Sequence, residues 1–140
     1  DMKDIINEKV KHRQWFRPFA PSIIKEEVKN WFKKDIASPY MSFVLDWKDD
    51  MKDKVPAVVH LDGTARLQTV TENDNKWYYN FIKKFGEKTG VPIVLNTSFN
   101  DREPIVETPE HAVNCFLGTD IDYLYFYDEN ILVEKYEDNI

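Results

Sequence analysis

The stretch from Asn73 to Leu95 constrains the fold more than any other part of this chain. Four apolar side chains recur in it at helical spacing: Trp77, Phe81, Ile82 and Phe85. This spacing predicts a helix over residues 73–89, and Gly90 is the residue type that ends helices. The apolar run Val91–Leu95 follows at once and predicts a buried strand. A helix that leads directly into a buried strand is typical of α/β domains, in which the helix packs on the sheet.

The rest of the chain alternates between the same two kinds of element. Apolar spacing and a Thr108 cap followed by Pro109 predict further helices over residues 3–12, 26–34 and 108–117. Apolar or alternating runs predict strands over residues 41–47, 56–61, 123–127 and 131–135. The last two strands flank the turn Asp128-Glu129-Asn130 and predict a hairpin, and the charged run 46–54 predicts an exposed turn. With 140 residues, of which 42% are apolar, the chain is expected to form a single α/β domain with a mixed sheet.

Proline interrupts this alternation in the segment Arg13–Ser22, which also contains arginines and aromatic residues. Neither a regular helix nor a central strand accepts Pro18 and Pro21 at this spacing, because proline lacks the N–H that both structures use. We therefore predict irregular structure for this segment.

Charge and cysteine content exclude several classes of protein. Nineteen Lys and Arg residues against 25 Asp and Glu give a net charge of −6, which argues against binding nucleic acid through bulk charge. The only cysteine, Cys115, excludes an internal disulfide and a multi-cysteine zinc site, and its helical context predicts a small buried residue. The three histidines are scattered, so no metal site is predicted.

The apolar runs and the first residues of the chain give expectations about its location and organisation. No apolar run approaches the roughly 18 residues of a membrane span, and no leader pattern is recognisable, so neither membrane insertion nor secretion is expected. A cytoplasmic location is expected. The first residue is Asp1 rather than Met, so we expect the chain to be part of a longer protein.

Three polar segments carry the candidate functional residues. The first places Lys11, Arg13 and Arg17 among aromatic side chains, which suits recognition of phosphate or carboxylate beside an apolar pocket. A solvated basic helix end is the alternative. The second is the turn Asp62-Gly63-Thr64 with Arg66 behind it, where Gly63 lets backbone approach a ligand. A hairpin turn with an exposed arginine is the alternative.

The third polar segment, Asn96-Thr97-Ser98-Phe99-Asn100, follows the strand 91–95 directly. Ligands of α/β sheets collect at the carboxyl ends of strands, where hydroxyls and amides meet them. Capping of the strand end by small polar residues is the alternative. No sequence-local base accompanies Ser98, so we expect it to donate a hydrogen bond to an anion and not to act as a nucleophile. These patterns together predict an anion-binding α/β domain.

Longer motifs in the same segments carry a family resemblance. They are Met2-Lys3-Asp4-Ile5-Ile6-Asn7 with residues 11–22, Val55-Pro56-Ala57 with residues 60–70, the run 90–100, and Glu103-Pro104-Ile105-Val106 with Thr108-Pro109-Glu110. In order and spacing they resemble the C-terminal domain of the carbamoyltransferase family that includes nodulation protein U and the antibiotic O-carbamoyltransferases. One departure is the pair Asp101-Arg102, where many relatives have glycine before the Glu-Pro-Ile-Val motif, so the role of Arg102 stays open.

The resemblance implies a YrdC-like fold, a twisted mixed sheet with flanking helices over a positively charged nucleotide cavity. Its Lys-x-Arg and Ser-x-Asn pairs match Lys11 and Arg13, and Ser98 and Asn100. It implies that such a domain forms carbamoyl-adenylate from carbamoyl phosphate and ATP, with Mg²⁺ held mainly by phosphates and water. It also implies an N-terminal Kae1-like domain, absent from residues 1–140, that holds iron and transfers the carbamoyl group to an acceptor hydroxyl.

Within this reading the site residues divide into two roles. Catalytic roles fall to Lys11, Arg13, Ser98 and Asn100, and cofactor-binding roles to Arg17, Arg66, Asn96 and Thr97. We expect the cations to point into one cavity, because two phosphate-bearing substrates carry far more charge than one arginine balances. Lys11→Ala is then expected to weaken nucleotide binding with little change in melting temperature. The alternatives are a non-catalytic nucleotide- or RNA-binding module, although nucleic acid is disfavoured by charge, and a structural domain for the absent neighbour.

Overall fold

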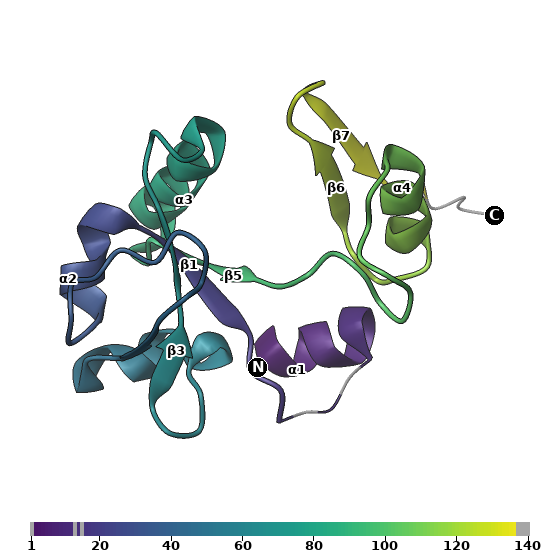
Figure 1. The fold of residues 1–140 in the computed structure, drawn as a ribbon. Helices are drawn as coiled ribbons and strands as arrows, with labels where there is room; N and C mark the ends of the chain where they lie inside the picture. The colour runs from purple at the N-terminus through teal and green to yellow at the C-terminus, as the bar shows by residue number, and fades with distance from the viewer. Residues whose placement is uncertain (1, 13, 15, 137–140) are drawn as a thin grey trace. The chain divides into compact units, whose positions relative to one another are not determined.

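The computed structural model describes residues 2–12, 14 and 16–136. They fall into two compact units (Figure 1). We call Pro18–Thr97 the sheet unit, and Met2–Arg17 together with Ser98–Ile140, described through Tyr136, the terminal unit.

The centre of the sheet unit is strand β1 (Ala20–Ile24), in which all five residues are buried. It pairs in parallel with β4 (Gln68–Val70) and antiparallel with β5 (Ile93–Asn96), giving the order β4-β1-β5. Parallel and antiparallel neighbours on one strand make this a mixed sheet. The predicted mixed α/β class is therefore confirmed.

Pro21 lies within this central strand, so the prediction of irregular structure over residues 13–22 is wrong for residues 20–22. The register explains how the sheet accepts it. Pairing with β4 begins only at Ser22, so Pro21 precedes the part of β1 that is hydrogen-bonded on both sides. Proline is tolerated near the start of a strand, where the ladder does not need its missing N–H.

Helix α3 (Lys76–Thr89) covers the sheet and matches the strongest prediction from the sequence (Figure 1). The Asn75 side chain caps its first turn by accepting from the Tyr78 amide, and Gly90, at φ 76°, ends it in the left-handed conformation. Ile82 is fully buried and packs in one cluster with Ile24 and Val70. The three aromatic residues that predicted the helix are much more exposed: Trp77 at 39%, Phe81 at 46% and Phe85 at 38%.

A second group of short elements completes the sheet unit. In chain order they are η2 (Lys25–Glu27), α2 (Val28–Trp31), β2 (Val44–Asp46), η3 (Asp49–Lys54), η4 (Pro56–Val58) and β3 (Thr64–Arg66). Strands β2 and β3 pair antiparallel. Their core is aromatic, because the fully buried Trp47 ring stacks on Phe32 at 4.1 Å and meets Trp31 edge-on. The helix predicted over 26–34 and the strand predicted over 41–47 are both confirmed in shorter form.

The strand predicted over 56–61 is wrong. Residues 56–58 form the 3₁₀ turn η4, in which Pro56 occupies the first turn and the Val59 amide donates to the Pro56 carbonyl. Proline fixes φ near the helical value, so an apolar run that begins with it closes a local turn more readily than it pairs with another strand. Val58 is buried, as the apolar pattern suggests, but Leu61 is 88% exposed.

The terminal unit joins the two ends of the chain. Its elements are α1 (Met2–Ile6), the π-helical turn η1 (Asn7–Lys11), α4 (Pro109–Leu117), β6 (Tyr123–Phe126) and β7 (Ile131–Glu134). Ala112 and Phe116 of α4 pack against Leu124 of the antiparallel β6–β7 hairpin (Figure 1). The Thr108 cap, Pro109 in the first turn and the hairpin are confirmed. Within the described ranges, no helix has the length and apolarity needed to span a membrane.

Two neighbouring positions on α3 test the core of the sheet unit. Ile82→Ala should lower the free energy of unfolding by about 2–4 kcal/mol, because it leaves a cavity against Ile24 and Val70. Phe81→Ala, at a position 46% exposed, should cost under about 1 kcal/mol. Urea denaturation followed by tryptophan fluorescence measures both values. Equal losses for the two variants would contradict this packing.

Candidate functional site

Lys11 is the last residue of η1, and its side chain turns into the terminal unit. The helix stops there because His12 adopts a left-handed conformation, with φ 48° and ψ 37°. Lys11 is only 5% exposed, which is unusual for a lysine. Single π-helical turns such as η1 are frequent at functional sites.

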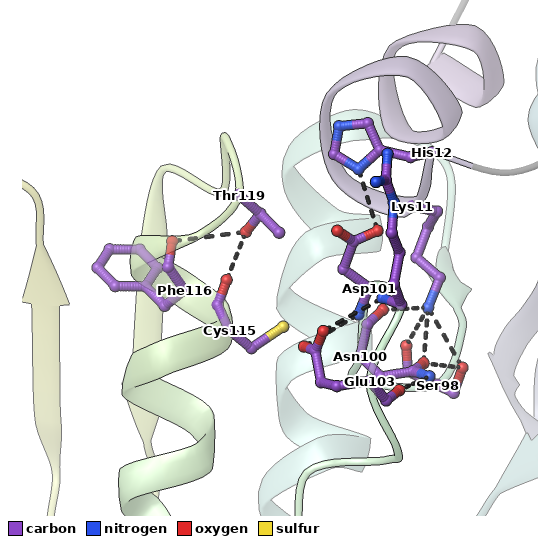
Figure 2. Close-up of polar contacts among 10 residues, drawn as sticks. Lys11, His12, Ser98, Asn100, Asp101, Glu103, Cys115, Phe116 and Thr119 are labelled. Atoms are coloured by element: carbon purple, nitrogen blue, oxygen red, sulfur yellow. Dashed lines mark hydrogen bonds and ion pairs between the residues drawn. The ribbon is translucent and has the colours of Figure 1, made fainter.

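Four oxygen atoms surround the Lys11 ammonium group (Figure 2). Nζ donates to the Ser98 carbonyl at 2.9 Å and contacts its hydroxyl at 3.3 Å. It also donates to the Asn100 carbonyl at 2.5 Å and to Asn100 Oδ1 at 2.9 Å. The lysine and the Ser-x-Asn pair are 87 to 89 residues apart in sequence, so the fold brings together two of the predicted motifs.

The loop that receives Lys11 is closed by its own side chains. Ser98 Oγ donates to Asn100 Oδ1 at 2.7 Å, and Asn100 Nδ2 donates to the Glu103 carbonyl at 2.8 Å. The partner of the Ser98 hydroxyl is thus an amide oxygen, which is not a general base. The donor role of Ser98 toward an anion stays a prediction.

The charge of Lys11 is the central electrostatic feature of this cluster. These four oxygen acceptors are formally neutral, and they solvate the ammonium group. An ammonium has three N–H bonds to share among four acceptors. An anionic oxygen makes a shorter and stronger hydrogen bond than a carbonyl, so an anion competes well for one of these positions.

Sequence reasoning missed a second set of polar residues around the same loop. His12 Nδ1 lies 3.0 Å from Asp101 Oδ1. The Glu103 carboxylate accepts from the backbone amides of Asp101 and Arg102 at 3.3 and 3.2 Å. Periodicity in the sequence cannot reveal a carboxylate that accepts hydrogen bonds from nearby backbone amides. The Glu-Pro-Ile-Val motif did, however, include Glu103.

Cys115 of α4 lies beside this loop, with its thiol next to the Glu103 carboxylate (Figure 2). Backbone amides and this thiol lower the pKa of Glu103 below its ordinary value. Burial and the neighbouring Glu103 raise the pKa of the Cys115 thiol, which is therefore protonated at neutral pH. Cys115 is buried, as its helical context predicted.

A pocket of about 610 Å³ lies along the side of α4 that carries Cys115. One wall is the loop from Asp101 to Glu107, and the other is a face of α4 with His111, Asn114 and Cys115. Pro104, Ile105 and Val106 make the loop wall apolar. Asp101, Glu103 and Cys115 are among the residues that line this pocket. They also lie beside one another, and Asp101 and Glu103 follow directly on the loop that receives Lys11.

The other predicted site residues have different surroundings. Arg13 lies outside the described residues. Arg17 is exposed in the terminal unit. Arg66 is exposed at the end of β3, and Asn96 and Thr97 are half-buried at the end of β5, all in the sheet unit. The common cavity predicted for these cations stays a prediction.

Asn96 has a defined role inside the sheet unit. Its Nδ2 donates to Gln68 Oε1 at 2.8 Å, and the fully buried Ser22 hydroxyl donates to the same oxygen at 2.8 Å. These contacts join the middle of β1, the start of β4 and the end of β5. They support the strand-end capping that was the alternative reading of Asn96.

The turn of the second polar segment is present. Gly63 has a positive φ of 79°, and Asp62 Oδ1 accepts from the Thr64 amide and hydroxyl at 3.1 and 2.7 Å. These hydrogen bonds lower the pKa of Asp62. Across residues 2–12, 14 and 16–136, the structure has no group of three His, Cys, Asp or Glu side chains arranged to hold a metal ion.

Comparison with known proteins identifies the family. The profile described as "Carbamoyltransferase C-terminus" matches residues 1–135, which is nearly the whole chain. The chain belongs to the carbamoyltransferase C-terminus family. The contact between Lys11 and the Ser98–Asn100 loop is thus a feature of a carbamoyltransferase C-terminal domain.

Relatives come from distant organisms. The chain is 47% identical over 126 residues to nodulation protein NolNO of Sinorhizobium fredii, covering 87% of this chain and 18% of that protein. It is 44% identical over 134 residues to an uncharacterized protein of Methanocaldococcus jannaschii, covering 95% of this chain and 22% of that protein. It is also 42% identical over 100 residues to nodulation protein U of Sinorhizobium fredii, covering 71% of this chain and 18% of that protein. The chain therefore spans about a fifth of the length of these relatives.

The burial of Lys11 changes the expected effect of its removal. The sequence suggested a cation in a wet pocket whose loss would hardly alter stability, but a 5% exposed ammonium with four oxygen contacts has a structural role as well. Lys11→Ala should lower the free energy of unfolding by about 1–3 kcal/mol, because it leaves carbonyl oxygens without donors. Lys9→Ala, two residues away and exposed, should change it by less than about 0.5 kcal/mol. Thermal denaturation of both variants decides the matter, and a Lys11→Ala variant as stable as Lys9→Ala would contradict the structural role of Lys11.

The lowered pKa of Glu103 gives a pH prediction. Because the folded-state pKa lies below the ordinary value of 4.5, ionised Glu103 stabilises the fold above that value, and the contribution is lost as pH falls through the folded-state pKa. Glu103→Gln should thus be less stable than wild type at neutral pH, and the difference should shrink in acid. Urea denaturation at neutral and at acidic pH measures this difference in stability. Glu107→Gln, from the same pocket wall, is the control. A difference that stays constant with pH would contradict this account.

Proposed function

We propose that this chain is the carbamoyl-adenylate-forming part of an O-carbamoyltransferase, binding ATP and carbamoyl phosphate. The observation that carries the proposal is the meeting of the buried Lys11 ammonium with Ser98 and Asn100, in a chain of this family. It places a fixed positive charge, a hydroxyl and an amide in one cluster. This is the kind of donor set that phosphoryl and adenylyl transfer require.

Each member of the cluster has a role in this proposal. Lys11 supplies charge to a phosphate or carbamoyl oxygen, taking that oxygen in place of one of its four neutral acceptors. Ser98 turns its hydroxyl from Asn100 Oδ1 toward the substrate, and Asn100 holds the loop in place. Arg13, Arg17, Arg66, Asn96 and Thr97 remain the proposed further contacts to the nucleotide.

The reaction balances with one water. The carbamate oxygen must first be freed from carbamoyl phosphate, which releases phosphate and consumes water. That oxygen then attacks the α-phosphorus of ATP, which forms carbamoyl-adenylate and releases pyrophosphate. Lys11 and Ser98 would stabilise the negative charge that spreads over the phosphate oxygens as these bonds change.

Mg²⁺ would enter with ATP. The described carboxylates do not gather into a metal-binding group, and this fits an ion whose ligands are mainly phosphate oxygens and water. When bound, the ion would supply neutralisation of phosphate charge. The acceptor hydroxyl, and the iron implied by the family resemblance, belong in this proposal to the much longer remainder of a full-length protein. A cytoplasmic location would give access to both substrates.

The test is release of pyrophosphate from ATP and Mg²⁺ in the presence of carbamoyl phosphate. We expect release only when both substrates are present, and no carbamoylated acceptor from this chain alone. Ser98→Ala should slow release by about tenfold to a hundredfold, because it removes a donor to the developing charge. Ser42→Ala, at an exposed serine, is the matched control and should have no effect.

Other outcomes have clear meanings. Nucleotide binding without pyrophosphate release, at wild-type Ser98, would favour a binding module without catalysis. A covalent carbamoyl adduct on Ser98 would contradict its donor role. Absence of both binding and release would remove the proposal.

A further inference from the structure

Glu103 closes the loop that Lys11 binds, from two directions. Its backbone carbonyl accepts from Asn100 Nδ2 at 2.8 Å. Its carboxylate accepts from the Asp101 and Arg102 amides at 3.3 and 3.2 Å. The two backbone amides that follow Asn100 are thus tied to one side chain, and Asn100 supplies two of the four oxygens around Lys11.

Cys115 anchors this carboxylate to a rigid part of the terminal unit. Its thiol lies beside the Glu103 carboxylate (Figure 2), and both residues line the same pocket. Cys115 is itself fixed, because α4 is capped at Thr108 and packs through Ala112 and Phe116. The Thr119 hydroxyl also donates to the Cys115 carbonyl at 2.9 Å. A path of contacts therefore runs from Cys115 of α4 through Glu103 and Asn100 to Lys11.

The sign of the Glu103 charge makes its presence informative. A carboxylate near a site for phosphate-bearing substrates repels them, so charge alone gives no reason for it there. The carboxylate instead accepts from two backbone amides and lies beside the Cys115 thiol, so its charge serves to fix the loop. Holding polar groups in place before the ligand arrives is how supporting residues raise affinity and rate.

We propose that Glu103, held by Cys115, is a positioning residue that sets the backbone of residues 100–102 and so orients Asn100 and Ser98 around Lys11. Its effect on substrates rests on the proposed function. Its effect on Lys11 does not, because the contacts that define it lie within the chain. The two effects are measured separately.

The first measurement is affinity for carbamoyl phosphate and for ATP with Mg²⁺, by calorimetry on the chain. Glu103→Gln loses one carboxylate oxygen and cannot satisfy both amides and the thiol in the same way. It should weaken binding by about tenfold, because small displacements of positioned groups are costly. If Glu103 acts only as a charge, the same variant should bind these anions more tightly. Glu107→Gln removes a charge from the same pocket wall and is the matched control, expected to stay within twofold of wild type.

The second measurement uses Cys115 and needs no change at Glu103. Cys115→Ser keeps a donor for the carboxylate and should bind substrates nearly as wild type does. Cys115→Ala removes the donor and should weaken binding in the direction of Glu103→Gln. This pair also decides the matter if Glu103→Gln fails to fold. Equal behaviour of the serine and alanine variants would overturn the role of Cys115.

The third measurement is independent of any substrate. Acetylation of Lys11 by acetic anhydride, followed by mass spectrometry, reports how well its ammonium group is enclosed. At a temperature at which every variant is fully folded, Glu103→Gln should speed this modification severalfold, and Glu107→Gln should not. If wild type binds neither substrate, the proposed function fails while this measurement still tests the positioning role. Unchanged Lys11 reactivity or tighter anion binding in Glu103→Gln would overturn the proposal.

Discussion

A buried lysine ammonium with oxygen partners on a distant loop is the interaction on which the terminal unit depends. Lys11 comes from the N-terminal helical turn, whereas its acceptors belong to Ser98 and Asn100. Desolvating an ammonium group is costly, and only a full set of oriented acceptors offsets that cost. Three features place those acceptors around Lys11. They are the left-handed conformation of His12, the hydrogen bond between Ser98 and Asn100, and the hydrogen bond from Asn100 to the Glu103 carbonyl.

This arrangement explains how an acidic protein can hold an ammonium group at a defined point. The net charge of −6 is spread over the whole chain, but local structure governs the field at one point. Lys11 contacts neutral oxygens of Ser98 and Asn100, while Asp101 contacts His12 and Glu103 accepts from backbone amides. The ammonium group is therefore held at a position fixed by the fold. The proposed function, in which the domain binds phosphate-bearing substrates, requires such a position.

Much of this could be predicted from the sequence, for identifiable reasons. Periodicity and end signals predicted α3 and α4, because helix spacing and caps are local properties. The Lys-x-Arg and Ser-x-Asn pairs were found through their family motifs, but their direct contact is long-range and has no local signal. The strand expected at 56–61 failed because an apolar run alone does not separate a strand from a proline-led turn. The central strand accepts Pro21 because β4 pairs with β1 only from Ser22 onward. No local sequence pattern predicts this register. Glu103 and Cys115 were missed as partners because each acts through a single contact with another segment.

The central claim is that the Lys11 ammonium group is held by Ser98 and Asn100, and nuclear magnetic resonance tests it most directly. In a sample labelled with ¹⁵N and ¹³C, the Nζ protons of an enclosed lysine exchange slowly enough with water to be observed. We predict a resolved Lys11 Nζ signal with nuclear Overhauser contacts to the side chains of Ser98 and Asn100, while exposed lysines such as Lys9 give none. A Lys11 signal that is lost to rapid exchange, like that of Lys9, would contradict the account.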